Sequence, residues 1–541
     1  MTIRAIEQDL DRARQLALAA DEGSAKDVLL SLMPPIEEAG REDLMLEVYA
    51  QLGEIYLVRT AYDGVTECLG RIEASLQAYR DIRAGLRVGA AGDVTMTDDE
   101  IDAVLCRYRR RALFLQSGLA AAHGEHERAG AALRSLAGDT GGGALAAEHA
   151  YLVTYANILC AVALCDDDLH VQSLPLWERV FEDLDAPADG SELDDNLRVL
   201  AGTGYGRFCV ETGRLTEADP HLRRAGARAQ ARGWQLATAR TQLERATAAW
   251  AAGDRRLAQD LVHECYPAIA EHARAHDVSR CWLYFGLISI SVGALDDADE
   301  RLGHAERHWR ELGRPLHIHR ILLQRSWVDI LRGDFAAATA RVHAARELLD
   351  SWPRHSWLQY ARLDDHLGSI LRAEALADPD HAGEKFAQAA ELKVPAALAV
   401  DSVRHAIADA DARMRWATCV SARILAGAFA VAADWGNTEL LSELIEYHCA
   451  RGTFSMPEAP QGADWADTAT AAVPVEDADE YALVASGNGP VPDGPLSTLG
   501  ALPPLRMDPA GEPVLVGYRE LAHRRYGRRV TADDAEWSTW P

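Results

Sequence analysis

This sequence lacks the signatures of several common enzymes and of membrane proteins. It contains no Gly-x-x-x-x-Gly-Lys-Ser/Thr loop, no Gly-x-Ser-x-Gly elbow and no His-Glu-x-x-His pair, so nothing supports P-loop hydrolysis, a serine nucleophile elbow or a zinc peptidase. No stretch approaches about 18 consecutive apolar residues. Acidic residues interrupt the segment from Met1 to Asp21, which therefore does not resemble a secretory leader. We expect no catalytic residues, no cofactor and no membrane span.

Cysteine is scarce and shows no pairing pattern. The nine cysteines are an odd number without a Cys-x-x-Cys pair, and residues such as Cys160, Cys209 and Cys281 stand among apolar neighbours. Such cysteines are typical of reduced, buried thiols rather than of a disulfide framework. This pattern predicts a cytoplasmic protein.

Basic residues are outnumbered, and the formal net charge is −28. Nucleic acid and anionic membranes would be repelled by that average charge, so we expect neither as a partner. The acidic excess serves solubility or, alternatively, selects a basic partner. Two basic clusters lack the interleaved aromatic residues of a single-strand binding platform, which leaves protein contact or a solvated face; they are Arg107, Arg109, Arg110 and Arg111, and Arg519, Arg524, Arg525, Arg528 and Arg529.

What the sequence does contain is a repeat of 40 residues. Four columns of residues recur with this period. A column of turn glycines is followed five residues later by alanine, and seven residues earlier stands a second column of small residues. The columns are Gly213, Gly253, Gly293 and Gly333; Ala218, Ala258, Ala298 and Ala338; Gly206, Ala246, Gly286 and Ser326; and the aliphatic Leu222, Val262, Leu302 and Val342.

This registration predicts stacked helical hairpins. Small residues allow two helices to approach closely, and aliphatic residues fill the space between hairpins. Alanine is abundant and β-branched runs are scarce, which favours helices over sheets. We therefore expect an all-α solenoid in which Gly213 to Gly333 are turn positions and Gly206, Ala246 and Gly286 are helix contacts.

The segment Tyr49-x-x-Leu52-Gly53-x-x-Tyr56 resembles the first-helix signature of the tetratricopeptide repeat, and Gly53 then occupies the helix-contact position. The resemblance covers residues 5 to 395, although the period of 40 exceeds the usual length of about 34. It implies a right-handed superhelical solenoid with a concave groove. Repeats elongated in this way are similar to the sensor arms of maltose-activator-type regulators and to repeats that accompany CHAT caspase-like peptidases.

Composition divides the chain into four parts. We expect the repeat array over residues 1–395, capping helices over 396–451, a disordered acidic linker over 452–505 and an apolar and basic tail over 506–541. The linker contains eight acidic residues and no Lys or Arg between Gly452 and Leu505. A glycine-containing segment over residues 82–100, which we expect to be a surface loop, ends in Thr97-x-x-Glu100, a candidate capping box for the next helix.

The tail has the composition of a docking peptide. An apolar and basic segment after a long linker can reach a groove on its own chain or on a partner. An inert tail is the third alternative. The candidate docking residues are Leu505, Arg506, Tyr518, Arg524, Arg525 and Tyr526.

Histidine spacing gives one pattern that a metal site would share. His304 and His308 stand four residues apart, and His317 and His319 follow closely. A zinc site also needs convergence and usually a cysteine or carboxylate. We expect solvated or capping histidines and no metal.

Taken together, these features predict a non-catalytic scaffold that binds a protein or peptide partner in its groove, in a bacterial signalling or defence module. A ligand-sensing regulatory arm is the first alternative. An enzyme with an unrecognised site is the second, and it would show perturbed ionisable groups that converge in a closed pocket.

Overall fold

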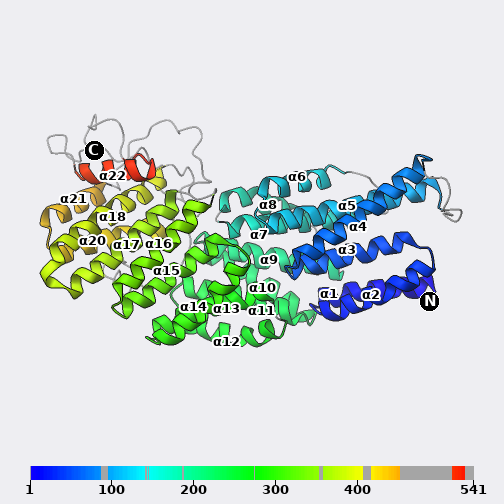
Figure 1. Cartoon of the computed structure of the whole chain (residues 1–541), viewed down its shortest axis with the longest axis horizontal. Helices are drawn as coiled ribbons and strands as arrows, with labels where there is room; N and C mark the ends of the chain where they lie inside the picture. The colour runs from blue at the N-terminus through cyan, green and yellow to red at the C-terminus, as the bar shows by residue number, and fades with distance from the viewer. Residues whose placement is uncertain are drawn as a thin grey trace. The chain divides into compact units, whose positions relative to one another are not determined.

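The computed structural model describes residues 2–86, 96–139, 143, 145–167, 169–185, 188–272, 274–352, 357–405, 416–450 and 514–530. All regular elements in these ranges are helices. Helices α1 to α18 follow one another as hairpins (Figure 1). The described part of the chain is therefore an all-α solenoid of helical hairpins, as the 40-residue period predicts. The bounds are α1 (Ile3–Leu18), α2 (Glu22–Glu38), α3 (Glu42–Val58), α4 (Tyr62–Arg83), α5 (Asp98–Ala122), α6 (His126–Ala137), α7 (Ala146–Asp166), α8 (His170–Asp183), α9 (Glu192–Glu211), α10 (Leu215–Ala231), α11 (Gln235–Ala251), α12 (Arg255–Glu271), α13 (Ala275–Ser291), α14 (Leu295–Glu311), α15 (Pro315–Leu331), α16 (Phe335–Ser351), α17 (Trp357–Ala377) and α18 (Ala382–Ser402).

Each hairpin from α9 to α16 turns at a glycine in the left-handed region of the backbone. The φ angles are 73° at Gly213, 83° at Gly253, 76° at Gly293 and 76° at Gly333. A residue with a side chain is strained at such angles, whereas glycine is not. The second helices that follow these turns carry the alanine column, whose members are fully buried: Ala218, Ala258, Ala298 and Ala338.

The other small-residue column stands where two helices approach closely. A Cβ atom at Gly286 would lie 2.7 Å from Cγ of Leu302 in the partner helix α14. A Cβ atom at Gly206 or Gly53 would also meet a leucine side chain at less than its normal contact distance. Ala246 is fully buried at the equivalent place in α11. These positions have a packing role, and they contribute no polar side chain to a site.

The capping box expected before the third hairpin is present. The Thr97 hydroxyl accepts a 3.4 Å hydrogen bond from the Glu100 amide, and the Glu100 carboxylate accepts one of 2.7 Å from the Thr97 amide. Two backbone donors at the start of α5 are thereby satisfied, which determines where this helix begins.

Helix α7 is long and apolar enough to cross a membrane by length and composition alone. It packs against α5, α6 and α8, and more than half of its most apolar stretch is buried. Packing between hairpins therefore explains its apolar character.

The chain forms two compact units. Unit 1 consists of Met1–Phe208, Thr216–Ala248 and Asp260–Val278, and unit 2 consists of Cys209–Leu215, Ala249–Gln259 and Ser279–Pro541. Helices α9 to α13 contribute to both. In unit 2 a short turn η1 (Pro379–His381) stands between α17 and α18, and α18 is followed by η2 (Val403–His405), a π-helical turn η3 (Ala417–Ser421), α20 (Ala422–Trp435), α21 (Thr438–Ala450) and α22 (Val516–Tyr526).

The boundary expected at residue 395 falls within a helix. Helix α18 runs through Pro395, which is buried, and continues to Ser402. Proline removes one backbone hydrogen bond, but α18 packs against both α17 and α20, and this packing outweighs the loss. The last repeat helix and the first capping segment are thus one helix. The linker expected over 452–505 lies outside the described residues.

Candidate functional site

The first helices of successive hairpins in unit 1 form one row. Helix α1 contacts α3, α3 contacts α5, and α5 contacts α7. Over the same described residues, the second helices α2, α4 and α6 have at most marginal contact with one another. A row whose neighbours touch lies on the inside of a curved array, because the inside has the smaller radius. Side chains of α3, α5 and α7 on this side form the inner face of unit 1.

Arg111 of α5 links three helices of that row. Its guanidinium group lies 2.8 Å from the carboxylate of Glu54 in α3 and 3.1 Å from that of Glu148 in α7. It also lies 3.6 Å from the carboxylate of Glu47 in α3. Arg107, one turn earlier, contacts Glu148 at 2.9 Å and Glu47 at 3.6 Å. These ion pairs connect three successive hairpins through their first helices.

Two glutamates of this cluster differ in electrostatic environment. Burial raises the pKa of Glu47, but Arg111 and Arg107 outweigh burial and bring the pKa to about 2. The same carboxylate accepts a 3.2 Å hydrogen bond from the Tyr108 hydroxyl. At Glu54 burial prevails over Arg111, so the pKa is raised. Glu47 is therefore a fixed anion, whereas a hydrogen-bond donor from a ligand would stabilise the charge of Glu54.

Two tyrosine rings of α7 lie beside the ion pairs. The rings of Tyr151 and Tyr155 meet edge to face with centroids 5.8 Å apart, and the Tyr151 hydroxyl accepts a 3.3 Å hydrogen bond from Asn196 of α9. Burial, with a contribution from Glu54, raises the pKa of Tyr155 to about 12. Burial also raises the pKa of Tyr151 well above its usual range. Both side chains nevertheless keep partial exposure. They are surrounded by protein and remain accessible, as expected on a concave surface.

The opposite side of this face comes from residues far along the chain. Burial raises the pKa of Tyr155, and the guanidinium groups of Arg274 and Arg240 act on it in the other direction. Arg240 of α11 pairs with Asp277 of α13 at 3.0 Å. Arg274, just before α13, donates a 3.0 Å hydrogen bond to the carbonyl oxygen of Val58 at the end of α3. The segment just before α13 therefore contacts the end of α3, so a late part of unit 1 lies against an early part.

Further contacts close unit 1 at this point. Arg274 forms an ion pair with the buried Glu22 of α2. A ring nitrogen of His272 lies 3.1 Å from the carbonyl oxygen of Ala20. We define the inner cluster as the charged and tyrosine side chains that this closure surrounds: Glu47, Glu54, Arg107, Arg111, Glu148, Tyr151, Tyr155, Arg240 and Arg274.

The tail forms a second candidate site, within unit 2. Helix α22 packs against α18 and α17 (Figure 1). Of the tail residues singled out from the sequence, Tyr526 is buried, Tyr518 is half-buried, and Arg524 and Arg525 are exposed. The other two, Leu505 and Arg506, lie outside the described residues.

Polar contacts join α22 to the last hairpin. The Tyr526 hydroxyl donates a 2.7 Å hydrogen bond to the carboxylate of Asp364 in α17, which also pairs with Arg346 of α16. Arg525 donates a 2.6 Å hydrogen bond to the carbonyl oxygen of Glu391 in α18. Apolar contacts accompany them, since α22 belongs to the same buried core as α17, α18, α20 and α21.

One buried charge in α22 has no hydrogen-bond partner. Arg519 is 5% exposed, and none of its three guanidinium nitrogens makes a hydrogen bond. Burial lowers its pKa to about 10, in spite of the nearby Tyr447, Glu443 and Glu446 of α21. An unsatisfied buried charge costs free energy, so Arg519 weakens the attachment of α22.

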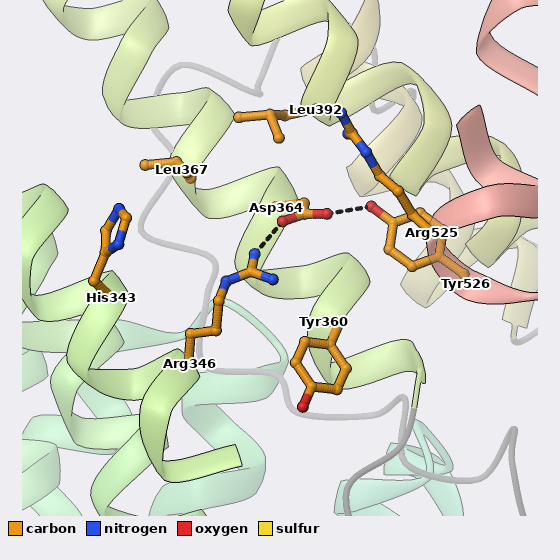
Figure 2. A pocket seen from close by; sticks show the side chains of 8 residues that line it. All are labelled: His343, Arg346, Tyr360, Asp364, Leu367, Leu392, Arg525 and Tyr526. Carbon is orange, nitrogen blue, oxygen red and sulfur yellow. Dashed lines mark hydrogen bonds and ion pairs between the residues drawn. The ribbon is translucent and has the colours of Figure 1, made fainter. Parts of the chain in front are cut away.

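An open pocket of about 420 Å³ lies beside α22. Asp364 supplies the carboxylate of its lining, and Figure 2 shows that this group faces Arg346 and Tyr526. The lining residues are His343 and Arg346 of α16, Tyr360, Asp364 and Leu367 of α17, Leu392 of α18, and Arg525 and Tyr526 of α22.

The four closely spaced histidines do not share one site. His308 and His317 both pack against Trp309, with ring centroids 4.8 Å and 4.1 Å away. His304 stacks instead on the tryptophan of α13. His319 is buried, and burial lowers its pKa to about 3. Aromatic stacking and burial account for these side chains, whereas a zinc site would require that their nitrogens converge.

Arg107 and Arg111 stand out in the sequence as members of a basic cluster, but the sequence does not indicate the carboxylates with which they pair. Their spacing of four residues, and the spacing of seven between Glu47 and Glu54, place each pair on one helix face. That signal was available. What the sequence does not provide is the relative rotation of successive hairpins, and this rotation brings Tyr155 and the distant Arg274 to the same place.

A comparison with protein-family models and with curated protein sequences gives no match. Among solved structures, the apo form of RapI covers 75% of this chain and 98% of its own length, at 10% identity and a TM-score of 0.40. A Rap protein complexed with competence and sporulation factor covers 72% and 98%, at 14% identity and 0.42. The Cut9-Hcn1 structure covers 80% and 94%, at 12% identity and 0.30. Likeness at this level leaves open what this chain binds.

Proposed function

We propose that this chain is a non-catalytic adaptor and that the inner face of unit 1 binds an extended segment of a protein partner. The observation that carries this proposal is the position of Tyr155 on α7, whose pKa responds to Glu54 of α3, to Arg240 of α11 and to Arg274 just before α13. A ligand on such a face contacts several hairpins at once, which suits an elongated peptide.

The inner cluster has the hydrogen-bonding groups that a peptide main chain requires. Because their pKa values are raised, Tyr151 and Tyr155 are protonated at neutral pH, and their hydroxyl groups can donate to carbonyl oxygens. Arg240, whose side chain is 40% exposed, adds further donors. Glu54 is an acceptor for amide N–H groups. The two rings supply rigid apolar surface beside these polar groups.

The same properties weigh against an enzyme with an unrecognised site. A catalytic base needs a pKa near the working pH. In the inner cluster the pKa of Glu47 is about 2, and at Arg111 ion pairing with the glutamates outweighs burial and keeps the guanidinium group charged. The carboxyl group of Glu54, whose pKa burial raises, is itself held in an ion pair with Arg111. The cluster, as we define it, holds no histidine, cysteine or serine. We infer that this face binds its ligand without reacting with it.

A ligand-sensing regulatory arm is the second candidate. The closure of unit 1 at Arg274 favours it, because an enclosed face can also hold a small molecule. For either candidate we propose a bacterial signalling or defence setting, in which elongated repeats form sensor arms or accompany CHAT peptidases. We also propose a cytoplasmic location, since the described cysteines are free thiols and most are buried.

Site-specific photocrosslinking tests the adaptor proposal. A benzoylphenylalanine residue replaces Tyr155 in the full chain, and in a control variant it replaces Glu67, which is exposed on the second helix α4. After irradiation in the producing cells, we expect a protein adduct of discrete size from position 155 and none from position 67. Equal adducts at both positions, or none at 155, would contradict an inner-face protein partner. A small-molecule mass increment at position 155 alone would favour the sensing arm.

A further inference from the structure

The pocket beside α22 combines an apolar floor with cationic groups. Leu367, Leu392 and the ring of Tyr360 supply the apolar part. Arg346, Arg525 and the imidazole of His343 stand around them (Figure 2). In a chain of net charge −28, this lining is a local exception.

The carboxylate of this lining is already engaged. Asp364 accepts the hydrogen bond from Tyr526 and pairs with Arg346. Arg525 donates a hydrogen bond to the Glu391 carbonyl oxygen and also interacts with the Tyr526 hydroxyl, and its side chain is exposed. The polar groups that an incoming ligand meets are therefore mainly positively charged hydrogen-bond donors.

We propose that this pocket binds a ligand in which an apolar group adjoins a carboxylate. Such a ligand is either a free apolar carboxylic acid or the C-terminal residue of a peptide. The carboxylate would lie between Arg525 and Arg346, since guanidinium groups bind carboxylates through paired, charge-assisted hydrogen bonds. The apolar group would lie on Leu367 and Leu392. The volume of about 420 Å³ is in the range of small-ligand pockets.

Ligand binding at this place is linked to the state of the tail. Arg525 and Tyr526 form one wall of the pocket, and both belong to α22. A ligand that contacts this wall binds the attached form of α22 better than the detached form, so it shifts the chain towards attachment. Binding of an acidic ligand in this pocket would thus favour the attached position of α22. The proposed function of unit 1 does not require α22.

Calorimetric titration of the full chain tests this inference. The probes are octanoate and N-acetyl-Leu-Leu with a free carboxyl end, which represent the two sources of the carboxylate. Their amides, octanamide and N-acetyl-Leu-Leu-amide, are matched controls that keep the apolar group and remove the charge. We expect at least one acid to bind, its amide to bind at least 10-fold more weakly, and hydrogen exchange in residues 516–526 to slow when that acid is bound.

Two variants locate the site. R525Q should weaken acid binding at least 5-fold, whereas R524Q, which changes the exposed neighbour outside the pocket, should stay within 2-fold. Because R525Q also removes a contact of α22, L392E serves as a second variant that leaves α22 unchanged. Its added carboxylate should reduce binding at least 10-fold. If neither acid binds, if acid and amide bind equally, or if L392E binds like the unmodified chain, the inference is wrong.

Discussion

The hydroxyl group of Tyr526 and the carboxylate of Asp364 are 162 residues apart in the sequence and form a hydrogen bond of 2.7 Å. Both groups are buried, and Arg346 completes the environment of the carboxylate. This bond connects the tail to the last repeat. The attachment of α22 therefore depends on a small number of contacts that can be changed one at a time.

Removal of the Tyr526 hydroxyl should loosen α22. In Y526F, Asp364 loses one of its two partners in a buried place, which costs about 1–3 kcal/mol. We expect faster amide hydrogen exchange in residues 516–526. Y518F is the matched control, because the Tyr518 hydroxyl makes no hydrogen bond in the described structure. Equal exchange in the two variants would show that the bond to Asp364 contributes nothing to attachment.

Replacement of Arg519 should have the opposite effect. R519M keeps much of the side-chain volume and removes a buried charge that has no hydrogen-bond partner. We expect a gain of about 1 kcal/mol or more in the attachment of α22, seen as slower exchange in the same residues. R524M, which changes an exposed arginine of the same helix, should change attachment by less than about 0.5 kcal/mol. A loss of attachment in R519M would mean that this guanidinium group is satisfied in solution.

Arg111 should be the most sensitive charged residue of unit 1. R111M removes the ion-pair partner of Glu54 and one partner each of Glu47 and Glu148, which keep Arg107, and a broken buried ion pair costs about 3–5 kcal/mol. The exposed pair of Arg71 and Glu67 provides the control, since R71M should cost far less than R111M. Urea unfolding of both variants measures the difference. Similar losses would show that the Arg111 ion pairs act like surface pairs.

The part of the fold that could be predicted is the part that repeats. Each turn needs a residue with a positive φ angle, which favours glycine. The 40-residue period of glycines therefore predicts where each turn lies: at Gly213, Gly253, Gly293 and Gly333. The path of α18 through Pro395 could not be predicted, because it depends on packing from α20, which follows later in the chain. The proline by itself favours the end of a helix at residue 395, whereas packing against α20 stabilises the helix beyond it.

Gly286 offers a direct test of the helix-contact column. In G286L the new side chain meets Leu302, whose Cγ atom would lie 2.7 Å from the Cβ position. Overpacking of this kind costs about 1–3 kcal/mol, so the urea midpoint should fall. G383L is the control, because a Cβ atom at Gly383 would have no neighbour within 4 Å. A fully stable G286L protein would mean that α13 and α14 do not approach each other as described.

Acid should destabilise unit 2 through two buried histidines. Burial lowers the pKa of His319 and of His366 to about 3, and Lys393 lowers that of His366 further. The unfolded chain therefore binds more protons than the folded chain between pH 6.5 and 3, and the free energy of unfolding falls as the pH falls through that window. At pH 5 the expected loss is about 2 kcal/mol for each histidine.

Chemical unfolding at pH 7.5 and pH 5 measures this effect. The double variant H319Q H366Q should lose less stability between the two pH values than the unmodified chain, even if it is less stable at both. H523Q changes an exposed histidine and should follow the unmodified chain. An unchanged pH dependence in the double variant would assign the acid sensitivity to other groups.

The candidate sites were less predictable than the repeats. Tyr518, Arg525 and Tyr526 could be named as docking residues because composition marks the tail, but the sequence does not say which groove α22 contacts. Tyr155 carries no local signal at all. Its surroundings come from α3, α11 and the residue before α13, and such a meeting of distant helices follows from accumulated curvature rather than from any short motif.

The contact of Arg274 with Glu22 and with the carbonyl oxygen of Val58 has a consequence for how this chain can evolve. Tandem repeats are usually duplicated or lost with little harm, because each unit touches only its neighbours. In unit 1 a duplicated hairpin between α4 and α11 would carry Arg274 past its partners, and a deleted one would leave it short of them. The contacts of Arg274 therefore fix the number of these hairpins, and with it the width of the inner face.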